Sequence, residues 1–89
     1  MSTQPQSALS TAEITQRVTA IWRDILGPGS DRPGATFFEL NGQSIAAVQI
    51  SAAIEEQLGV ALDIGALFED PDLETVTRVV LGASGNSAG

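Results

Sequence analysis

The first clear pattern is a run of apolar residues at helical spacing near the start of the chain. Ser10-Thr11-Ala12-Glu13 has the form of a capping box, in which the glutamate reaches back to the helix start. The apolar positions that follow recur on one helical face: Ile14, Val18, Ile21, Trp22 and Ile25. We therefore expect a helix to about Leu26, ended by Gly27-Pro28-Gly29 and with Trp22 in the core.

A second periodic run follows the dipeptide Asn41-Gly42. Both residues accept positive φ at low cost, so this dipeptide predicts a turn. Ser44 comes after it with the position of an N-cap, and the helix should run to about Leu58 with Gly59 as its left-handed cap. At about 100° per residue, one broad face of this helix is predicted to be core: Ala46, Ala47, Ile50, Ala53, Ile54 and Leu58.

The opposite sector of this second helix is also apolar. It carries Ser44, Ile45, Val48 and Ala52. Two explanations stay open: the preceding loop covers Ile45 and Val48, or these side chains form a small docking surface around Ser44. Ser44 itself is either a plain helix cap or a site for an anion such as phosphate, because a helix N-terminus offers free N–H groups.

The rest of the chain predicts a long connection and two shorter helices. The connection from Gly27 to Leu40 is long for so small a domain, and buried Phe37, Phe38 and Leu40 are expected to pin it. Its end, residues 35–40, is expected to form one helical turn. Further along the chain, Asp63 and Asp72 are expected to cap a short helix and a last helix, and Gly82 to end the last one.

These elements predict an all-α fold, a small bundle of three main helices plus one short helix. The expected organisation is a flexible leader at residues 1–9, a folded domain at 10–82 and a flexible tail at 83–89. An initiating methionine and a tail at each end favour a free-standing protein over an excised module.

Composition narrows the possible chemistry. The 89 residues allow one domain, and they include no cysteine and no histidine, which removes disulfides, the usual zinc ligands and Ser-His or Cys-His catalytic pairs. We expect no catalytic residue and no metal site. Four arginines against eleven acids give a net charge of −7, which argues against nucleic acid and anionic membranes and for basic partner surfaces. Without an apolar span or a signal peptide, the expected location is the cytoplasm.

Three segments in order resemble the acyl and peptidyl carrier proteins, most of all the peptidyl carrier (thiolation) proteins of nonribosomal peptide synthesis. Residues 21–27 (IWRDILG) resemble the end of the family's first helix, and residues 37–45 (FFELNGQSI) resemble its phosphopantetheine attachment motif. Residues 67–74 (LFEDPDLE) resemble the segment that leads into its last helix. The resemblance extends from about Ile14 to Leu81.

The resemblance implies a non-catalytic carrier whose cofactor is covalent 4'-phosphopantetheine. Ser44 would accept this group from a phosphopantetheinyl transferase, with Asn41, Gly42 and Gln43 completing the attachment motif. The thiol of the arm would hold an aminoacyl or peptidyl group as a thioester. The implied partners are an adenylation enzyme and condensation or tailoring enzymes of natural-product biosynthesis, for example of antibiotics, acting on a monomeric carrier.

The partner-docking positions of the family match Ile45, Val48 and Ala52. The sequence departs from the family pattern at Asn41, where glycine is usual, and at Gln43, where histidine or aspartate is usual. Gln43 therefore leaves a polyketide, fatty-acid or aryl carrier as an alternative. A small acidic adaptor with Ser44 as a cap is the alternative from another class. An enzyme has the least support, since no acid–base partner is available for Ser44.

Overall fold

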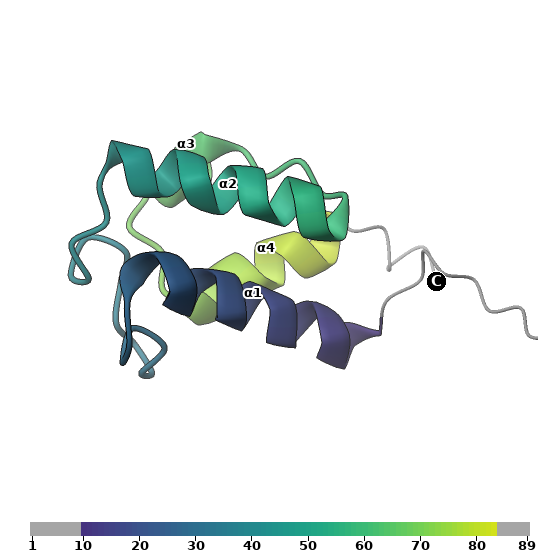
Figure 1. The fold of residues 1–89 in the computed structure, drawn as a ribbon, viewed down its shortest axis with the longest axis horizontal. Helices are drawn as coiled ribbons and strands as arrows, with labels where there is room; N and C mark the ends of the chain where they lie inside the picture. The colour runs from purple at the N-terminus through teal and green to yellow at the C-terminus, as the bar shows by residue number, and fades with distance from the viewer. Residues whose placement is uncertain (1–9, 84–89) are drawn as a thin grey trace, which may run out of the picture.

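The computed structural model describes residues 10–83, and this part of the chain forms four helices without a strand. They are α1 (Thr11–Leu26), α2 (Ser44–Leu58), α3 (Ile64–Leu67) and α4 (Leu73–Ala83). Figure 1 shows α1 running antiparallel to α2 and α4, with the long α1–α2 connection at one end of the bundle. This confirms the predicted all-α fold of three main helices and one short helix. The predicted leader at 1–9 and residues 84–89 of the predicted tail lie outside the described residues.

The helix ends follow the local sequence signals. The Ser10 hydroxyl oxygen accepts the Glu13 N–H at 3.0 Å, and a Glu13 carboxylate oxygen accepts the Ser10 N–H at 3.0 Å, which completes the predicted capping box. Gly59 ends α2 with φ +70°, in the predicted left-handed conformation. Gly82 does not end α4 as predicted: the helix continues through it to Ala83. A glycine inside a helix lowers its propensity only modestly and does not by itself stop it.

The core lies where α1 packs against both α2 and α4. Ile50 and Ile54 are buried, as the helical pattern predicted, but Leu58 is only half-buried and packs at the edge of the core. The buried apolar core comprises Ile14, Val18, Ile21, Trp22, Phe37, Ala46, Ala47, Ile50, Ile54, Val60, Leu62, Leu67, Val76 and Val80.

Trp22 joins the core to the long α1–α2 connection. Its side chain is fully buried, as predicted, and its ring centroid lies 6.3 Å from that of Phe37 in a tilted arrangement. Its indole N–H donates to the Ser30 carbonyl oxygen at 2.8 Å, and the Ser30 hydroxyl donates to the Gly27 carbonyl oxygen at 2.6 Å. Trp22 therefore holds the first half of the connection, a role that the apolar pattern did not predict.

The predicted pinning residues of the connection divide into buried and exposed ones. Phe37 is fully buried and Leu40 is half-buried against the core, but Phe38 is 50% exposed, so its predicted burial is wrong. Successive side chains of a helical turn point about 100° apart, so only one of two adjacent phenylalanines enters the core. In the stretch from residue 10 to 83, no helix has both the length and the apolarity to cross a membrane.

Candidate functional site

The segment before α2 is a single helical turn with its own cap. The Thr36 N–H donates to a Glu39 carboxylate oxygen at 3.1 Å, and the Glu39 N–H donates to the Thr36 hydroxyl oxygen at 3.3 Å. The Leu40 N–H then bonds the Thr36 carbonyl at 3.0 Å, which confirms the predicted helical turn. The Thr-x-x-Glu spacing is a second capping box, and this signal is present in the sequence at Thr36 and Glu39.

The Asn41-Gly42 dipeptide leads from this turn into α2. Asn41 is left-handed with φ +66°, as predicted, and the Gly42 N–H donates to the Phe37 carbonyl oxygen at 2.8 Å. The predicted turn is therefore present, and of its two residues Asn41 alone takes the positive φ, because Gly42 is not left-handed. The reason for glycine here is space: a Cβ on Gly42 would lie 2.5 Å from Cδ1 and Cε1 of the Phe37 ring. The backbone thus passes in direct contact with a buried aromatic ring, two residues before Ser44.

Ser44 is the first residue of α2 and not its cap. Gln43 occupies the N-cap position with extended backbone (φ −126°, ψ 177°) and makes no capping hydrogen bond with its side chain. The interpretation of Ser44 as an N-cap is therefore wrong by one position. The Ser44 side chain is exposed, and its hydroxyl has no hydrogen-bond partner among residues 10–83. The Ser44 hydroxyl is therefore accessible to solvent and accepts no backbone N–H of the first turn.

The N-terminus of α2 favours an anion. The first backbone N–H groups of a helix have no intrahelical partner and carry the positive end of its dipole. In α1, α3 and α4 a side-chain oxygen of Ser10, Asp63 or Asp72 accepts one of these donors. In α2 no side chain does so, and its first turn contains no acid. A phosphate esterified to Ser44 would thus lie beside unused donors, so the residues present fit a phosphate group.

Backbone and side-chain bonds tie this region to the α3–α4 connection. The Phe37 N–H donates to the Pro71 carbonyl oxygen at 2.8 Å, and the Phe38 N–H donates to a carboxylate oxygen of Asp70 at 2.8 Å. Thr36 and Asp72 form an isolated antiparallel bridge. The partners are more than thirty positions apart in sequence, so no local pattern predicted these contacts.

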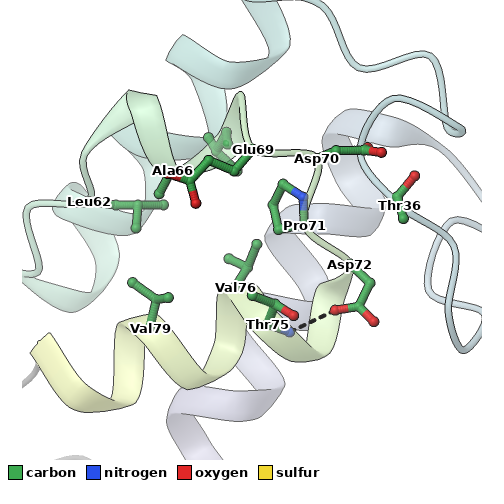
Figure 2. Close-up of a pocket in the computed structure, with 11 residues that line it drawn as sticks. Thr36, Leu62, Ala66, Glu69, Asp70, Pro71, Asp72, Thr75, Val76 and Val79 are labelled. Atoms are coloured by element: carbon green, nitrogen blue, oxygen red, sulfur yellow. Dashed lines mark hydrogen bonds between the residues drawn. The ribbon is translucent and has the colours of Figure 1, made fainter.

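Asp72 caps α4, as the sequence predicted. Its carboxylate accepts the Thr75 N–H at 2.9 Å, drawn as the dashed line in Figure 2. The Thr75 hydroxyl and then the Thr75 N–H stabilise the ionised form, and together they hold the pKa of Asp72 below its ordinary value of 3.8.

The second apolar sector of α2 is exposed. Ile45 is 66% exposed and Val48 is 51% exposed, and Ala52 is exposed as well. The explanation in which the long loop covers Ile45 and Val48 is therefore wrong. Phe38 and Phe68 are also about half exposed, which the apolar pattern did not predict. The exposed side chains of Ile45 and Val48, on the same helix as Ser44, are suited to contact with another protein.

A separate cavity of about 330 Å³ lies between α3, α4 and the connection that joins them. Figure 2 shows Leu62, Ala66, Val76 and Val79 among the side chains around it, with the Glu69 carboxylate beside Ala66 and Asp72 on the opposite side, below Pro71. None of the residues predicted for the attachment motif or for docking lines it. The cavity is therefore distinct from the surface around Ser44.

Comparison with known proteins gives one family for most of the chain. Residues 16–80 match the family described as "Phosphopantetheine attachment site". The match includes the helical turn, the Asn41-Gly42 dipeptide, Ser44 and the α3–α4 connection.

The curated relatives are much longer proteins. The phosphinothricin tripeptide synthetase of Streptomyces viridochromogenes is 33% identical over 67 residues, which are 75% of this chain and 6% of that protein. A nonribosomal peptide synthetase of Emericella nidulans is 31% identical over 93% of this chain and 1% of its own length. Tyrocidine synthase 2 of Brevibacillus parabrevis is 32% identical over 81% of this chain and 2% of its own length. The chain thus spans only a few per cent of these relatives, and no solved structure matches it.

Proposed function

The chain belongs to the phosphopantetheine-attachment family, whose members carry 4'-phosphopantetheine covalently, and from this premise we propose that it is a peptidyl carrier protein with Ser44 as its attachment site. The main support for this proposal is the exposure and the position of the Ser44 hydroxyl. Its hydroxyl is exposed and without a partner among the described residues, at the uncapped N-terminus of a 15-residue helix. Asn41, Gly42 and Gln43 form the rest of the attachment motif.

The arm supplies the chemistry that the chain lacks. Attached through a phosphodiester to the Ser44 oxygen, it provides a thiol, which a cysteine-free chain does not have, and the thiol holds an aminoacyl or peptidyl group as a thioester. The phosphate of the arm adjoins the unused N–H donors of the first turn of α2. A phosphopantetheinyl transferase brings its own acid–base groups. The chain contains no histidine that could act as a general base for Ser44, which supports a non-catalytic carrier.

Ile45, Val48 and Ala52 form the proposed docking surface for partner enzymes. All three are exposed on α2 beside Ser44, where they contribute little to the core. The exposed carboxylate of Glu55, with Glu39 in the preceding turn, adds negative charge to this surface and steers basic partner surfaces towards it. The net charge of −7 supports protein partners over nucleic acid or anionic membranes.

The names of the relatives support the peptidyl subtype. Two of them are named as a tripeptide synthetase and a nonribosomal peptide synthetase, so an adenylation enzyme that loads an amino acid and condensation or tailoring enzymes that use it are the proposed partners. We place the protein in the cytoplasm as a monomer. The choice of amino acid belongs to the loading enzyme.

The test is intact-protein mass spectrometry after incubation with coenzyme A and a phosphopantetheinyl transferase. The wild-type protein should gain one phosphopantetheine group, and Ser44→Ala should gain none. Ser10→Ala is the matched control, since it removes another exposed serine near a helix N-terminus and should leave the modification unchanged. Modification of Ser44→Ala would refute the site. An unmodified wild-type protein would favour the adaptor alternative.

A further inference from the structure

We propose that Asp70, in the α3–α4 connection, is a positioning residue for the modification of Ser44. Through its carboxylate it fixes the turn that leads into the attachment motif, although it lies 26 positions beyond Ser44 in the sequence. This inference rests on the proposed function. It adds a residue outside the attachment motif to those that determine how Ser44 is presented to the transferase.

The contact itself is a charge-assisted hydrogen bond. Asp70 Oδ1 accepts the Phe38 N–H at 2.8 Å, within the short range expected when one partner is ionised. In Figure 2 the Asp70 carboxylate points out of the cavity and towards the loop that carries Thr36. The Asp70 carboxylate therefore bonds the α1–α2 connection, although Asp70 is also one of the residues that line the cavity.

The backbone conformation at Asp70 limits which residues can make this contact. Its φ is +62°, in the left-handed region that is unfavourable for most side chains and tolerated best by glycine, asparagine and aspartate. Of these three residues, only asparagine and aspartate provide a side-chain oxygen. The conformation and the acceptor together restrict this position to Asp or Asn.

A short series of backbone contacts connects Phe38 to Ser44. Phe37, the neighbour of Phe38, is held by the Pro71 carbonyl on the same α3–α4 connection. The Phe37 carbonyl accepts the Gly42 N–H at 2.8 Å, and its ring lies directly against the Gly42 backbone. Gln43 and Ser44 follow at once. Releasing the Phe38 N–H thus loosens one of the anchors of the segment that sets the direction of Ser44.

Two substitutions at Asp70 separate the acceptor from the backbone conformation. Asp70→Gly keeps the left-handed backbone and removes the acceptor, whereas Asp70→Asn keeps both and removes only the charge. Asp24→Asn, on the exposed side of α1, is the control for the change in net charge. The measurements are amide hydrogen exchange of Phe38 and Gly42, and kcat and KM of the transferase for each carrier.

We expect the Phe38 amide of Asp70→Gly to exchange at least about tenfold faster, because it loses a hydrogen bond to a charged acceptor. The KM of the transferase for this variant should rise about two- to fivefold with kcat nearly unchanged, since a smaller fraction of the carrier presents Ser44 in the competent geometry. Asp70→Asn should lie between wild type and Asp70→Gly in both measurements, because its neutral amide oxygen still accepts the Phe38 N–H but less strongly than a carboxylate. Asp24→Asn should stay close to wild type.

Unchanged exchange and unchanged KM in Asp70→Gly would overturn the inference. An equal rise of KM in Asp70→Asn and Asp70→Gly would also overturn it, because the charge and not the acceptor would then be responsible. Both results presuppose that the wild-type protein is modified at Ser44. Failure of the wild type to accept phosphopantetheine would instead refute the proposed function, so the two failures are distinguishable.

Discussion

Replacing Gly42 with alanine tests the packing beneath the attachment motif. Alanine is acceptable to the backbone at this position, because Gly42 is not in the left-handed region. The added methyl group, however, would lie 2.5 to 2.6 Å from three carbon atoms of the Phe37 ring. Such distances are far below van der Waals contact, so either the ring or the backbone must move.

The loss of stability in Gly42→Ala depends on how far the Phe37 ring can move away from the added methyl group. Its side chain is fully buried and packs against Trp22, which is fully buried as well. Inserting a methyl group into a well-packed core costs about 1–3 kcal/mol. In a domain of this size each kcal/mol lowers Tm by about 4–8 °C, so we expect Gly42→Ala to melt several degrees below wild type or lower still.

Thermal unfolding followed by circular dichroism measures this change, and the chain provides a matched control. Gly82 lies inside α4, where a Cβ would meet no atom within 4 Å. Gly82→Ala should therefore raise the stability by up to about 1 kcal/mol through helix propensity alone. The same glycine-to-alanine substitution should therefore lower Tm at position 42 and raise it at position 82.

The double variant Gly42→Ala/Phe37→Leu identifies the cause. Leucine is smaller than phenylalanine and leaves room for the methyl group, so the two changes together should cost less than the sum of their separate costs. An unchanged Tm for Gly42→Ala would refute the reasoning. Strict additivity in the double variant would show that the clash lies elsewhere.

The remaining predictions concern the two faces of α2 and the cap of α4. Ile54→Ala should lower the free energy of unfolding by about 2–5 kcal/mol in urea titrations, because Ile54 is fully buried. Val48→Asp should leave Tm nearly unchanged, since Val48 is half exposed, but should slow loading by the adenylation enzyme; a large drop in Tm or unchanged loading would contradict this. Asp72→Ala should cost about 1 kcal/mol at neutral pH. Because the folded pKa of Asp72 is lowered, its stabilisation is present above pH 3.8 and is lost as the pH falls through the lowered pKa, so the two urea midpoints should converge in acid.

The sequence predicted the elements whose signals are local. The capping box at Ser10, the left-handed Gly59 and the caps at Asp63 and Asp72 each depend on residues within a few positions, and the structure confirms them. Apolar spacing likewise identified the two faces of α2. Such features are determined by backbone geometry and side-chain periodicity, which neighbouring residues reveal.

The contacts that fix the attachment motif could not be predicted in the same way. The bond between Asp70 and Phe38 joins residues 32 positions apart, and the indole of Trp22 bonds a backbone carbonyl in an irregular loop. The reason for glycine at position 42 is the buried Phe37 ring, which no turn rule includes. These contacts depend on how the elements pack, so they become visible only once the bundle is assembled.

The one-position difference between a helix cap and a first helical residue explains why Ser44 is suited to modification. At an N-cap such as Ser10, the hydroxyl oxygen accepts a backbone N–H, and an ester on that oxygen would weaken a bond that stabilises the helix. Ser44 makes no such bond within the described residues, because Gln43 occupies the cap. The proposed esterification of Ser44 would therefore break no hydrogen bond within the described residues and would add a phosphate beside unused donors. The same division holds along α2, where Ile50 and Ile54 stabilise the core and Ile45 and Val48 remain available to partners.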